Sequence, residues 1–171
     1  RGGTEEQGFG SFRYGTKFGE DTTARAYVKG FNRDSNTLIA DGKSAGDSWD
    51  KVQGGFRLDS QLTTQDNLKF QGDIYQANIN QSSVYQQVAQ PFVFFQKDKA
   101  NSSGGNILGR YQHTFSPKSD YALQFYYDSY LQENVEFTDG RDTLDLDFQH
   151  RFVFLDWNEI VWGLNYRYGH D

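Results

Sequence analysis

The sequence contains no cysteine and only two prolines among its 171 residues. Without cysteine there is neither a disulfide framework nor a thiolate metal site, which suits an oxidising compartment in which disulfides are not used. Basic residues are in the minority, with 17 Lys and Arg against 23 Asp and Glu and a net charge of −6. Nucleic-acid binding depends on basic patches, so this charge balance argues against a nucleic-acid partner.

Long apolar runs are also missing. The longest runs, at residues 92–95 and 152–155, are short, whereas a membrane-spanning helix needs about 20 apolar residues. A strand of a membrane β-barrel, in contrast, crosses with about ten residues of alternating character. No signal peptide is visible and the chain starts at Arg1 rather than Met, so we expect a processed chain or a fragment.

The composition combines polarity with many aromatic residues. Mean hydropathy is −0.81, yet 17% of the residues are Phe, Tyr or Trp, and there are 18 glycines. A disordered chain of this polarity would contain few aromatic residues. A polar sequence rich in aromatics and glycine is typical of β structure with many turns. The length predicts one domain over residues 1–171.

Apolar and polar residues alternate with a period of two, which is the pattern of a strand with one apolar and one polar face. The alternation is clearest from residue 50 to 62, where Val52, Phe56 and Leu58 are separated by charged, amide and glycine residues. The pattern recurs at 68–75, 107–115, 121–131, 144–154 and 160–168. Residues 8–18 and 22–32 form a further hairpin, whose two faces the pattern does not resolve.

Short and long connections alternate along the chain. Short turns are expected at 19–21, 63–66, 116–120 and 155–159. Long loops are expected at 33–49, 77–103 and 132–140. Outer-membrane barrels have short periplasmic turns and long outside loops. We therefore predict an all-β, antiparallel, up-and-down transmembrane β-barrel, in which this chain supplies about eight strands of a larger barrel.

The apolar faces carry aromatic residues toward the strand ends, as at Trp162, Tyr166 and Tyr168. Aromatic girdles at the two membrane interfaces produce this distribution. The alternative is the core of a soluble β-sandwich, whose strands are usually shorter, at about 5–6 residues. Seven residues of the apolar faces are expected to face lipid: Leu58, Leu68, Phe70, Leu123, Phe125, Leu146 and Phe148.

Several segments resemble the first barrel strands of TonB-dependent outer-membrane receptors. They are residues 8–15 (GFGSFRYG), 26–34 (AYVKGFNRD), 55–59 (GFRLD), 68–75 (LKFQGDIY), 105–111 (GNILGRY), 142–152 (DTLDLDFQHRF) and 161–168 (VWGLNYRY). The resemblance covers nearly the whole chain. It implies a bacterial outer-membrane receptor for energy-coupled uptake of a ferric siderophore, cobalamin or a similar scarce nutrient, with outer-membrane lipid and TonB as partners and no cofactor.

In that family a plug domain precedes a larger barrel and carries the segment that contacts TonB. Neither the plug nor the rest of the barrel is visible in this sequence. We therefore expect the chain to begin at the extracellular end of the first barrel strand and to stop short of barrel closure.

Two other functions fit the same pattern. A self-contained eight-stranded outer-membrane protein, acting as an adhesin, anchor or lipid enzyme, shares the membrane physics, but its last strand has to pair with its first. A soluble ligand-binding β-barrel is the third reading. Detergent dependence separates the soluble barrel from the other two, and a plug upstream of Arg1 would decide for the receptor.

Candidate functional residues fall into two groups. Charges at mid-strand positions of the polar faces are expected to line the lumen: Arg57, Asp59, Lys69, Asp73, Asp145, Asp147 and Arg151. The predicted loop at 77–103 carries Tyr85, Phe92 and Phe94 among amide residues, a mixture suited to binding a chelate or another amphipathic ligand. Arg110 faces the polar side of its strand and would attract an anionic chelate. Alternatively, residues 91–96 only extend the hairpin above the membrane.

No metal or catalytic site is predicted. The three histidines are scattered without a zinc-binding spacing and are expected to be surface or interface residues. Asp142, Asp145 and Asp147 would suit calcium, but Arg151 on the same face is expected to neutralise them, which favours a charge network in the lumen. We find no enzyme signature, because no Ser–His–Asp arrangement follows without a fold to bring such residues together.

Overall fold

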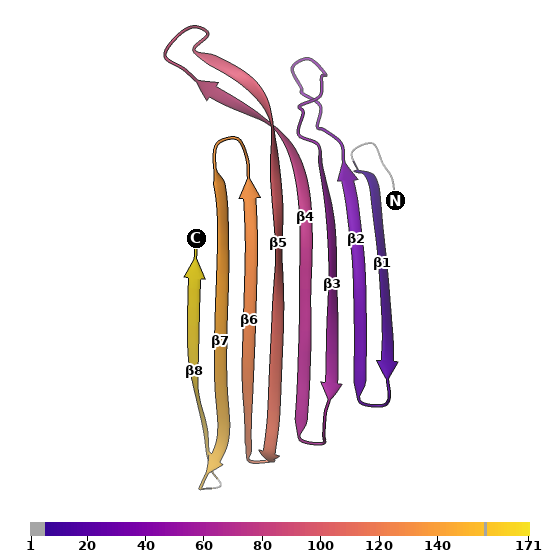
Figure 1. The fold of residues 1–171 in the computed structure, drawn as a ribbon, viewed down its shortest axis with the longest axis vertical. Coiled ribbons are helices and arrows are strands. Elements are labelled where there is room, and N and C mark those ends of the chain that lie inside the picture. The colour runs from indigo at the N-terminus through magenta and orange to yellow at the C-terminus, as the bar shows by residue number, and fades with distance from the viewer. Residues whose placement is uncertain (1–5, 156) are drawn as a thin grey trace.

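The computed structural model describes residues 6–155 and 157–171, which form eight β-strands in one antiparallel sheet (Figure 1). The strands are β1 (Glu6–Phe18), β2 (Thr22–Arg33), β3 (Trp49–Gln61), β4 (Asp66–Gln86), β5 (Val93–Ser116), β6 (Ser119–Glu133), β7 (Thr138–Phe154) and β8 (Asn158–His170). Among the described residues there is no apolar helix of the length that a bilayer requires.

Each strand pairs with the strands that precede and follow it in the sequence, so the order across the sheet is β1 to β8. The prediction of an all-β, antiparallel, up-and-down fold is confirmed. β1 and β8 lie at opposite edges (Figure 1) and do not pair with each other within the described residues. The sheet is therefore not closed into a barrel.

The connections at the lower end of the sheet in Figure 1 are all short. They are residues 19–21, 62–65 and 117–118 and the turn between β7 and β8. The predicted turn at 155–159 includes Asp156, which lies outside the described residues. The connections at the upper end are residues 34–48, 87–92 and 134–137. Successive connections thus lie at the lower and the upper end in turn, as expected for an up-and-down sheet.

Two of the three predicted long loops are wrong in extent. Most of 77–103 is strand, because β4 continues to Gln86 and β5 already begins at Val93, with unbroken pairing between them. The loop expected at 132–140 shrinks to 134–137. Sequence alternation marks a strand only where its two faces have different surroundings. In these segments apolar and polar residues do not alternate, so only the backbone pairing defines them as strand.

The register sorts the side chains into two faces, because directly opposite residues of neighbouring antiparallel strands point the same way. One row across β3 to β8 contains Leu58, Phe70, Gly109, Phe125, Leu146 and Tyr166. The adjacent row contains Asp59, Lys69, Arg110, Gln124, Asp147 and Asn165. The sheet therefore has an apolar face and a polar face, as predicted. In the first hairpin, Phe12 and Tyr14 lie on the apolar face opposite Val28 and Ala26.

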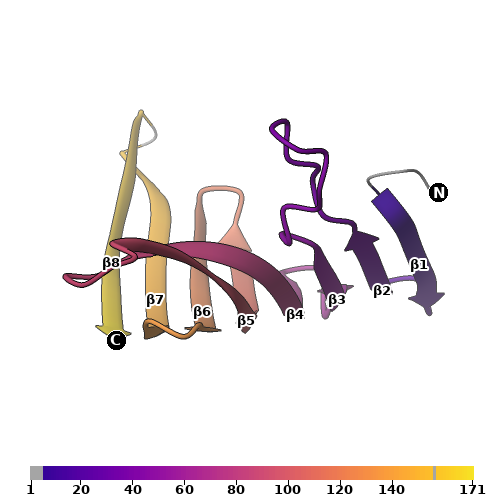
Figure 2. The same cartoon turned by 90° about the horizontal axis from the view of Figure 1, so that it is seen from above.

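The sheet is a single twisted layer, with the outer parts of β4 and β5 bending across the strands beside them (Figure 2). Among the described residues, the only buried apolar side chains are Ala77, Ala100 and Ala122. Large apolar side chains such as Phe12 and Leu164 are exposed. A soluble domain packs such side chains against a second layer, so this sheet has no hydrophobic core of its own.

The connection at 34–48 is ordered by polar contacts. Asn36 donates hydrogen bonds to Asp47 from its side-chain amide at 2.6 Å and from its backbone N–H at 2.7 Å. These bonds favour the ionised carboxylate and lower the pKa of Asp47 below its usual value. The Ser82 hydroxyl of β4 donates to the carbonyl oxygen of Ala45 at 2.9 Å, which holds the connection against the sheet.

Glycines allow the backbones of β3, β4 and β5 to approach closely. A Cβ atom at Gly72 would lie 2.7 Å from the carbonyl oxygen of Asn106 and 3.2 Å from the ring of Phe56. At Gly105 a Cβ atom would lie 2.8 Å from the carbonyl oxygen of Asp73. Glycines at such positions permit the local bending that an evenly pleated strand resists. The bend of this sheet therefore depends on residues without a side chain.

We expect Gly72→Ala to destabilise the folded sheet by about 1–3 kcal/mol, because the new methyl group overpacks against backbone. Gly10→Ala is the matched control on the same face, where a Cβ atom meets nothing within 4 Å. That change is expected to be neutral or slightly stabilising. Denaturant unfolding of the detergent-folded chain measures both, and equal losses of stability would contradict the assignment.

Candidate functional site

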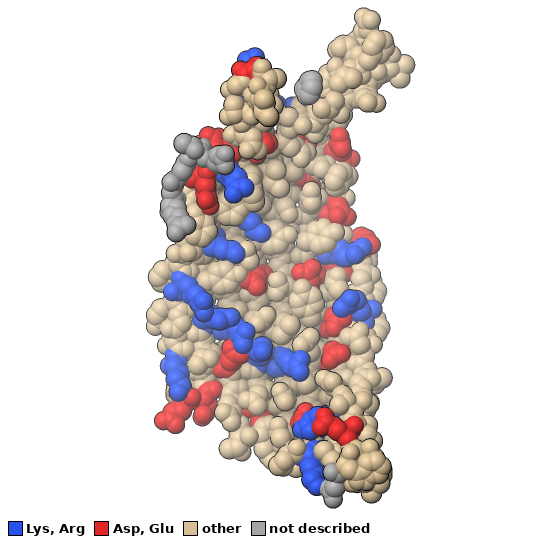
Figure 3. Space-filling model, turned by 180° about the vertical axis from the view of Figure 1, so that it is seen from behind, with Lys and Arg blue, Asp and Glu red and all other residues tan. Residues whose placement is uncertain are grey.

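The predicted mid-strand charges share the polar face of the sheet, which is the face seen in Figure 3. They are Arg57, Asp59, Lys69, Asp73, Asp145, Asp147 and Arg151, and Arg110 lies with them. They lie on β3, β4, β5 and β7, and the register, not any loop, places them on one face. That this face lines a lumen remains a prediction.

Hydrogen bonds within the polar face hold two of the carboxylates. Arg57 donates to both oxygens of Asp59, two residues further along β3, at 2.6 and 2.8 Å. Tyr27 donates its hydroxyl proton to Asp73, and the Gln53 amide donates to the Tyr27 oxygen at 3.1 Å. Both carboxylates thus accept bonds from side chains on the same strand or across β2, β3 and β4. Such pairing is typical of a structural network.

The expected neutralisation of Asp145 by Arg151 is wrong. Arg151 donates instead to Asp120 at 2.7 Å, and Asp145 accepts from Arg167 at 2.8 Å. Each of these pairs is directly opposite in the register, which the sequence alone does not provide. Asp142 lies on the apolar face, so the calcium alternative loses its third carboxylate. In the part of the chain that the structure describes, no three potential ligands come together to hold a metal ion.

The residues predicted to face lipid occupy two adjacent rows of the apolar face. One row holds Leu58, Phe70, Phe125 and Leu146, and the next holds Leu68, Leu123 and Phe148. Toward the upper connections this apolar band ends at a polar row of Asn32, Asp50, Asn78, Asn101 and Glu133. The apolar band is therefore bounded along the strands. Its contact with lipid remains a prediction.

Aromatic rings and histidines form a belt at the lower end of the apolar face. The ring centroids of His113 and Tyr121 are 5.7 Å apart, those of Tyr121 and Phe148 are 5.9 Å apart, and those of Phe148 and Trp162 are 5.4 Å apart. The Trp162 indole donates to Nδ1 of His150 at 3.1 Å. The sequence analysis predicted aromatic residues toward the strand ends, Trp162 among them, but not the contacts with the histidines, because the ring contacts join four strands.

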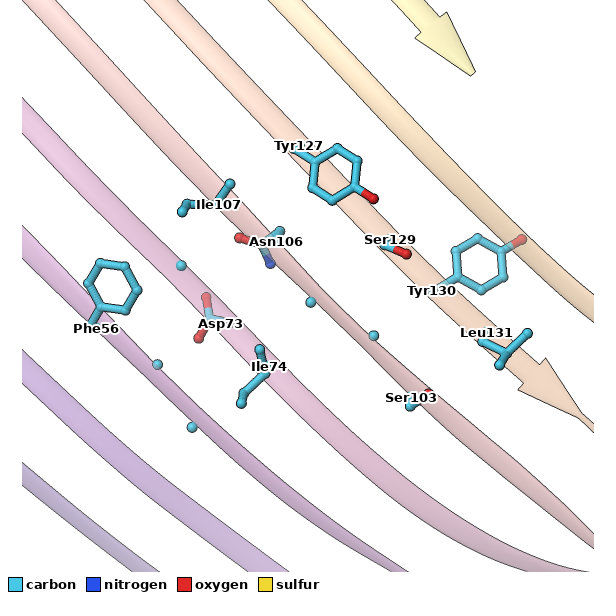
Figure 4. A pocket seen from close by; sticks show the side chains of 15 residues that line it. Phe56, Asp73, Ile74, Ser103, Asn106, Ile107, Tyr127, Ser129, Tyr130 and Leu131 are labelled. Atoms are coloured by element: carbon cyan, nitrogen blue, oxygen red, sulfur yellow. The ribbon is translucent and has the colours of Figure 1, made fainter. Parts of the chain in front are cut away.

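A hollow of about 700 Å³ opens on the apolar face between β3 and β6 (Figure 4). Its rim includes Phe56, Ile74, Ile107, Tyr127 and Leu131. Gly54, Gly72 and Gly105 leave its floor without side chains. Asp73 and Asn106 also line it, but the register directs their side chains to the polar face. Ser103, Tyr127 and Ser129 bring hydroxyl groups to the hollow, and the other side chains of its apolar-face lining are aliphatic or aromatic, which suits an apolar chain.

The structure brings the predicted ligand-binding aromatics together but not Arg110. Tyr85 and Phe94 are directly opposite at the end of β4 and β5, with stacked rings 5.4 Å apart. Phe92 lies in the adjoining connection and is 59% exposed. Arg110 lies about 50 Å further along β5, on the polar face of the sheet. Ligand binding by these residues remains a prediction.

Asp98 anchors the outer part of β4 and β5, here called the β4–β5 extension (residues 80–99). The residue is 8% exposed, and its carboxylate accepts a bond from the Gln81 amide at 3.2 Å. It also accepts one from the backbone N–H of Val135 at 3.3 Å, in the connection at 134–137. One buried carboxylate thus joins the extension to the neighbouring connection. The sequence analysis did not single out Asp98, because it assigned this segment to a loop.

Comparison of the chain with known protein families, curated proteins and solved structures finds no match. Its function is therefore to be inferred from the two faces of the sheet and from the tip of the β4–β5 extension.

We expect Asp98→Ala to speed hydrogen exchange at the Val135 amide by about tenfold, because the N–H loses its charged acceptor. Asp41→Ala is the control, since Asp41 is bonded only to Lys43, through an exposed ion pair at 3.1 Å and a hydrogen bond from the Lys43 backbone N–H at 3.1 Å, among the described contacts. Exchange measured by NMR or mass spectrometry should leave Val135 protected in the control. Unchanged protection of Val135 after Asp98→Ala would rule out the anchor.

Proposed function

We propose that this chain forms part of the wall of an outer-membrane β-barrel, with its apolar face against lipid and its polar face toward the lumen. The observation that carries the proposal is a one-layer sheet without a core, apolar on one face and charged on the other. Soluble monomers rarely expose contiguous apolar patches larger than a few hundred Å². Lipid would cover the whole apolar face at once.

The dimensions of the apolar band support this proposal. On β6 the band runs from Tyr121 to Leu131, which is about 34 Å along the strand. At the roughly 45° tilt of barrel strands, this corresponds to about 25 Å across the membrane, the height of the lipid-facing band in such proteins. The aromatic and histidine belt would then lie at one interface and the polar row at the other.

The open edges favour a larger barrel over a self-contained one. The outer edges of β1 and β8 have no partner strand among the described residues. Unpaired backbone groups in hydrocarbon cost several kcal/mol each, so the inserted sheet needs further strands between β8 and β1. A self-contained eight-stranded adhesin or anchor, the alternative, requires β8 to pair with β1.

We further propose that the barrel belongs to a receptor for TonB-dependent uptake of a ferric siderophore or a similar scarce nutrient. The segments that resemble this family lie in or along the strands, from 8–15 in β1 to 161–168 in β8. The β4–β5 extension supports the proposal too, because it carries Tyr85 and Phe94 beyond the apolar band. Substrate would first meet this aromatic tip and then the charged lumen.

The membrane proposal is tested by Phe70→Arg against Gln71→Arg. An arginine at the lipid-facing position should cost about 2–4 kcal/mol of folding free energy in a bilayer. The neighbouring position on the polar face should tolerate the same change with a smaller loss. Folding into vesicles, followed by denaturant titration, measures both variants. Equal penalties, or a wild-type chain that folds without detergent or lipid, would overturn the proposal.

The receptor proposal is tested at the tip of the extension in the full-length protein. Tyr85→Ala combined with Phe94→Ala should weaken substrate binding about tenfold or more, because stacked aromatic anchors supply contact area at low entropic cost. Val84→Ala is the control, since Val84 is exposed on the opposite face of the same ribbon. Affinity unchanged in the double variant, with normal membrane insertion, would refute binding at this tip.

A further inference from the structure

We infer that the apolar face binds one anionic membrane lipid, with an acyl chain in the glycine-floored hollow and a phosphate headgroup at Lys97 and Lys99. The hollow lies between β3 and β6 (Figure 4). The two lysines lie on the continuation of the same face along β5, in the β4–β5 extension. The inference rests on the proposed function, because it takes the apolar face to lie against lipid. It adds a lipid ligand of the wall itself, separate from any transported substrate.

The polarity of the side chains on this face changes in a regular order along β5. Alternate residues of a strand point to the same face, and from the hollow toward the tip they are Ile107, Gly105, Ser103, Asn101, Lys99 and Lys97. The residues directly opposite them on β4 follow a similar order: Gly72, Ile74, Gln76, Asn78, Asn80 and Ser82. An acyl lipid has its parts in this order, with an apolar chain, polar ester groups and then a charged phosphate.

The spacing along β5 suits one leaflet of a membrane. The strand from Ile107 to Asn101 is about 20 Å long. At the tilt of roughly 45° it spans about 14 Å across the membrane, which is close to half of the ~30 Å hydrocarbon core. Lys99 and Lys97 follow at about 7 and 13 Å beyond Asn101 along the strand. They would therefore lie at the level of the lipid headgroups.

The missing side chains of the hollow make room for the acyl chain. Gly54, Gly72 and Gly105 leave the floor open, while Phe56 and Ile107 stand at its rim. A chain in the hollow contacts the wall on several sides, so it gains more dispersion contacts than a chain on a flat surface. The hollow therefore favours one bound lipid over the lipids that only pass along the wall.

A cleft of about 570 Å³ surrounds the two lysines, between the connection at 34–48 and the extension. A Cβ atom at Gly46 would lie 3.6 Å from Cε of Lys97, so the connection packs against the stem of this lysine. Asn80 donates to the Ser48 hydroxyl oxygen at 2.8 Å, which leaves the hydroxyl hydrogen to donate to a ligand. Ammonium and hydroxyl donors together suit the oxygens of a phosphate.

The positive charge of the cleft is not neutralised by the part of the chain that the structure describes. Neither Lys97 nor Lys99 forms an ion pair there. The one carboxylate of the lining, Asp98, has its side chain on the opposite face, where it accepts the bonds described above. Asp50 and Glu133 lie one row nearer the apolar band and do not line the cleft. Lysines at a membrane surface attract anionic lipids.

The headgroup contact is tested with dimyristoyl phosphatidic acid and the full-length protein in detergent, by isothermal titration at low salt. We expect the lipid to bind, and inorganic phosphate, which has no acyl chain, to bind about a hundredfold more weakly. Lys97→Gln combined with Lys99→Gln should weaken lipid binding about tenfold, because the phosphate loses two charged donors. Lys17→Gln is the control, since Lys17 is exposed on the polar face at the other end of the sheet.

The chain contact is tested by Gly54→Leu, which fills the floor of the hollow. The site accepts the change, because a Cβ atom at Gly54 is in ordinary contact, 3.5 Å from the carbonyl oxygen of Tyr27. We expect affinity for the lipid to fall about tenfold. Gly10→Leu is the matched control on the same face but outside the hollow, where a Cβ atom meets nothing within 4 Å.

Absence of lipid binding, or equal affinity for inorganic phosphate, would overturn the inference, as would equal losses in Gly54→Leu and Gly10→Leu or in the lysine variant and Lys17→Gln. These results leave the membrane proposal intact, since that proposal depends on the comparison of Phe70→Arg with Gln71→Arg. Conversely, a chain that binds the lipid through Gly54 and the two lysines, but folds without detergent or lipid, would keep the lipid site and refute the membrane barrel.

Discussion

The ladder of backbone hydrogen bonds is the constraint on which the rest of this structure depends. No second layer packs on the described sheet, so the register of each strand against its neighbours decides which side chains meet. A slip of one residue would send every side chain of a strand to the other face. In β4 it would turn Phe70 toward the charges and Lys69 toward the apolar side. The register of the backbone hydrogen bonds therefore determines which side chains form each face, and the apolar and polar character of the faces favours that one register.

A one-layer sheet of this kind needs two different environments. In the part of the chain that the structure describes, the buried apolar side chains are three alanines, so burial within the sheet contributes little to its stability. The stabilisation that a globular domain draws from its core would here come from whatever covers the apolar face. Lipid covers such a face without any shape complementarity, whereas a protein layer would have to match eight strands. Charged residues on the other face would remain hydrated.

Sequence reasoning predicted the parts of the fold in which adjacent residues have different surroundings. The alternation at 50–62 and 68–75 correctly identified β3, the first half of β4 and both of their faces. It failed for the β4–β5 extension, where apolar and polar residues do not alternate. It also failed for the partner of Asp145 and for the rings around His113, because these contacts cross strands. The local sequence pattern predicts on which face of the sheet a residue lies. Only the register of the strands determines which residues are its neighbours.

The β4–β5 extension has a mechanical consequence. It continues as two strands beyond its buried contact at Asp98, and a two-stranded ribbon is far more compliant than a wide sheet. From Gln81 to Gln86 the ribbon measures about 17 Å, so a rotation of roughly 10° at its base would displace the tip by about 3 Å. The extension is thus held near its base at Asp98 and at Ser82, and its tip projects beyond both contacts. A force on the stacked rings of Tyr85 and Phe94 would be transmitted to these two contacts, and through them to the connections at 134–137 and 34–48.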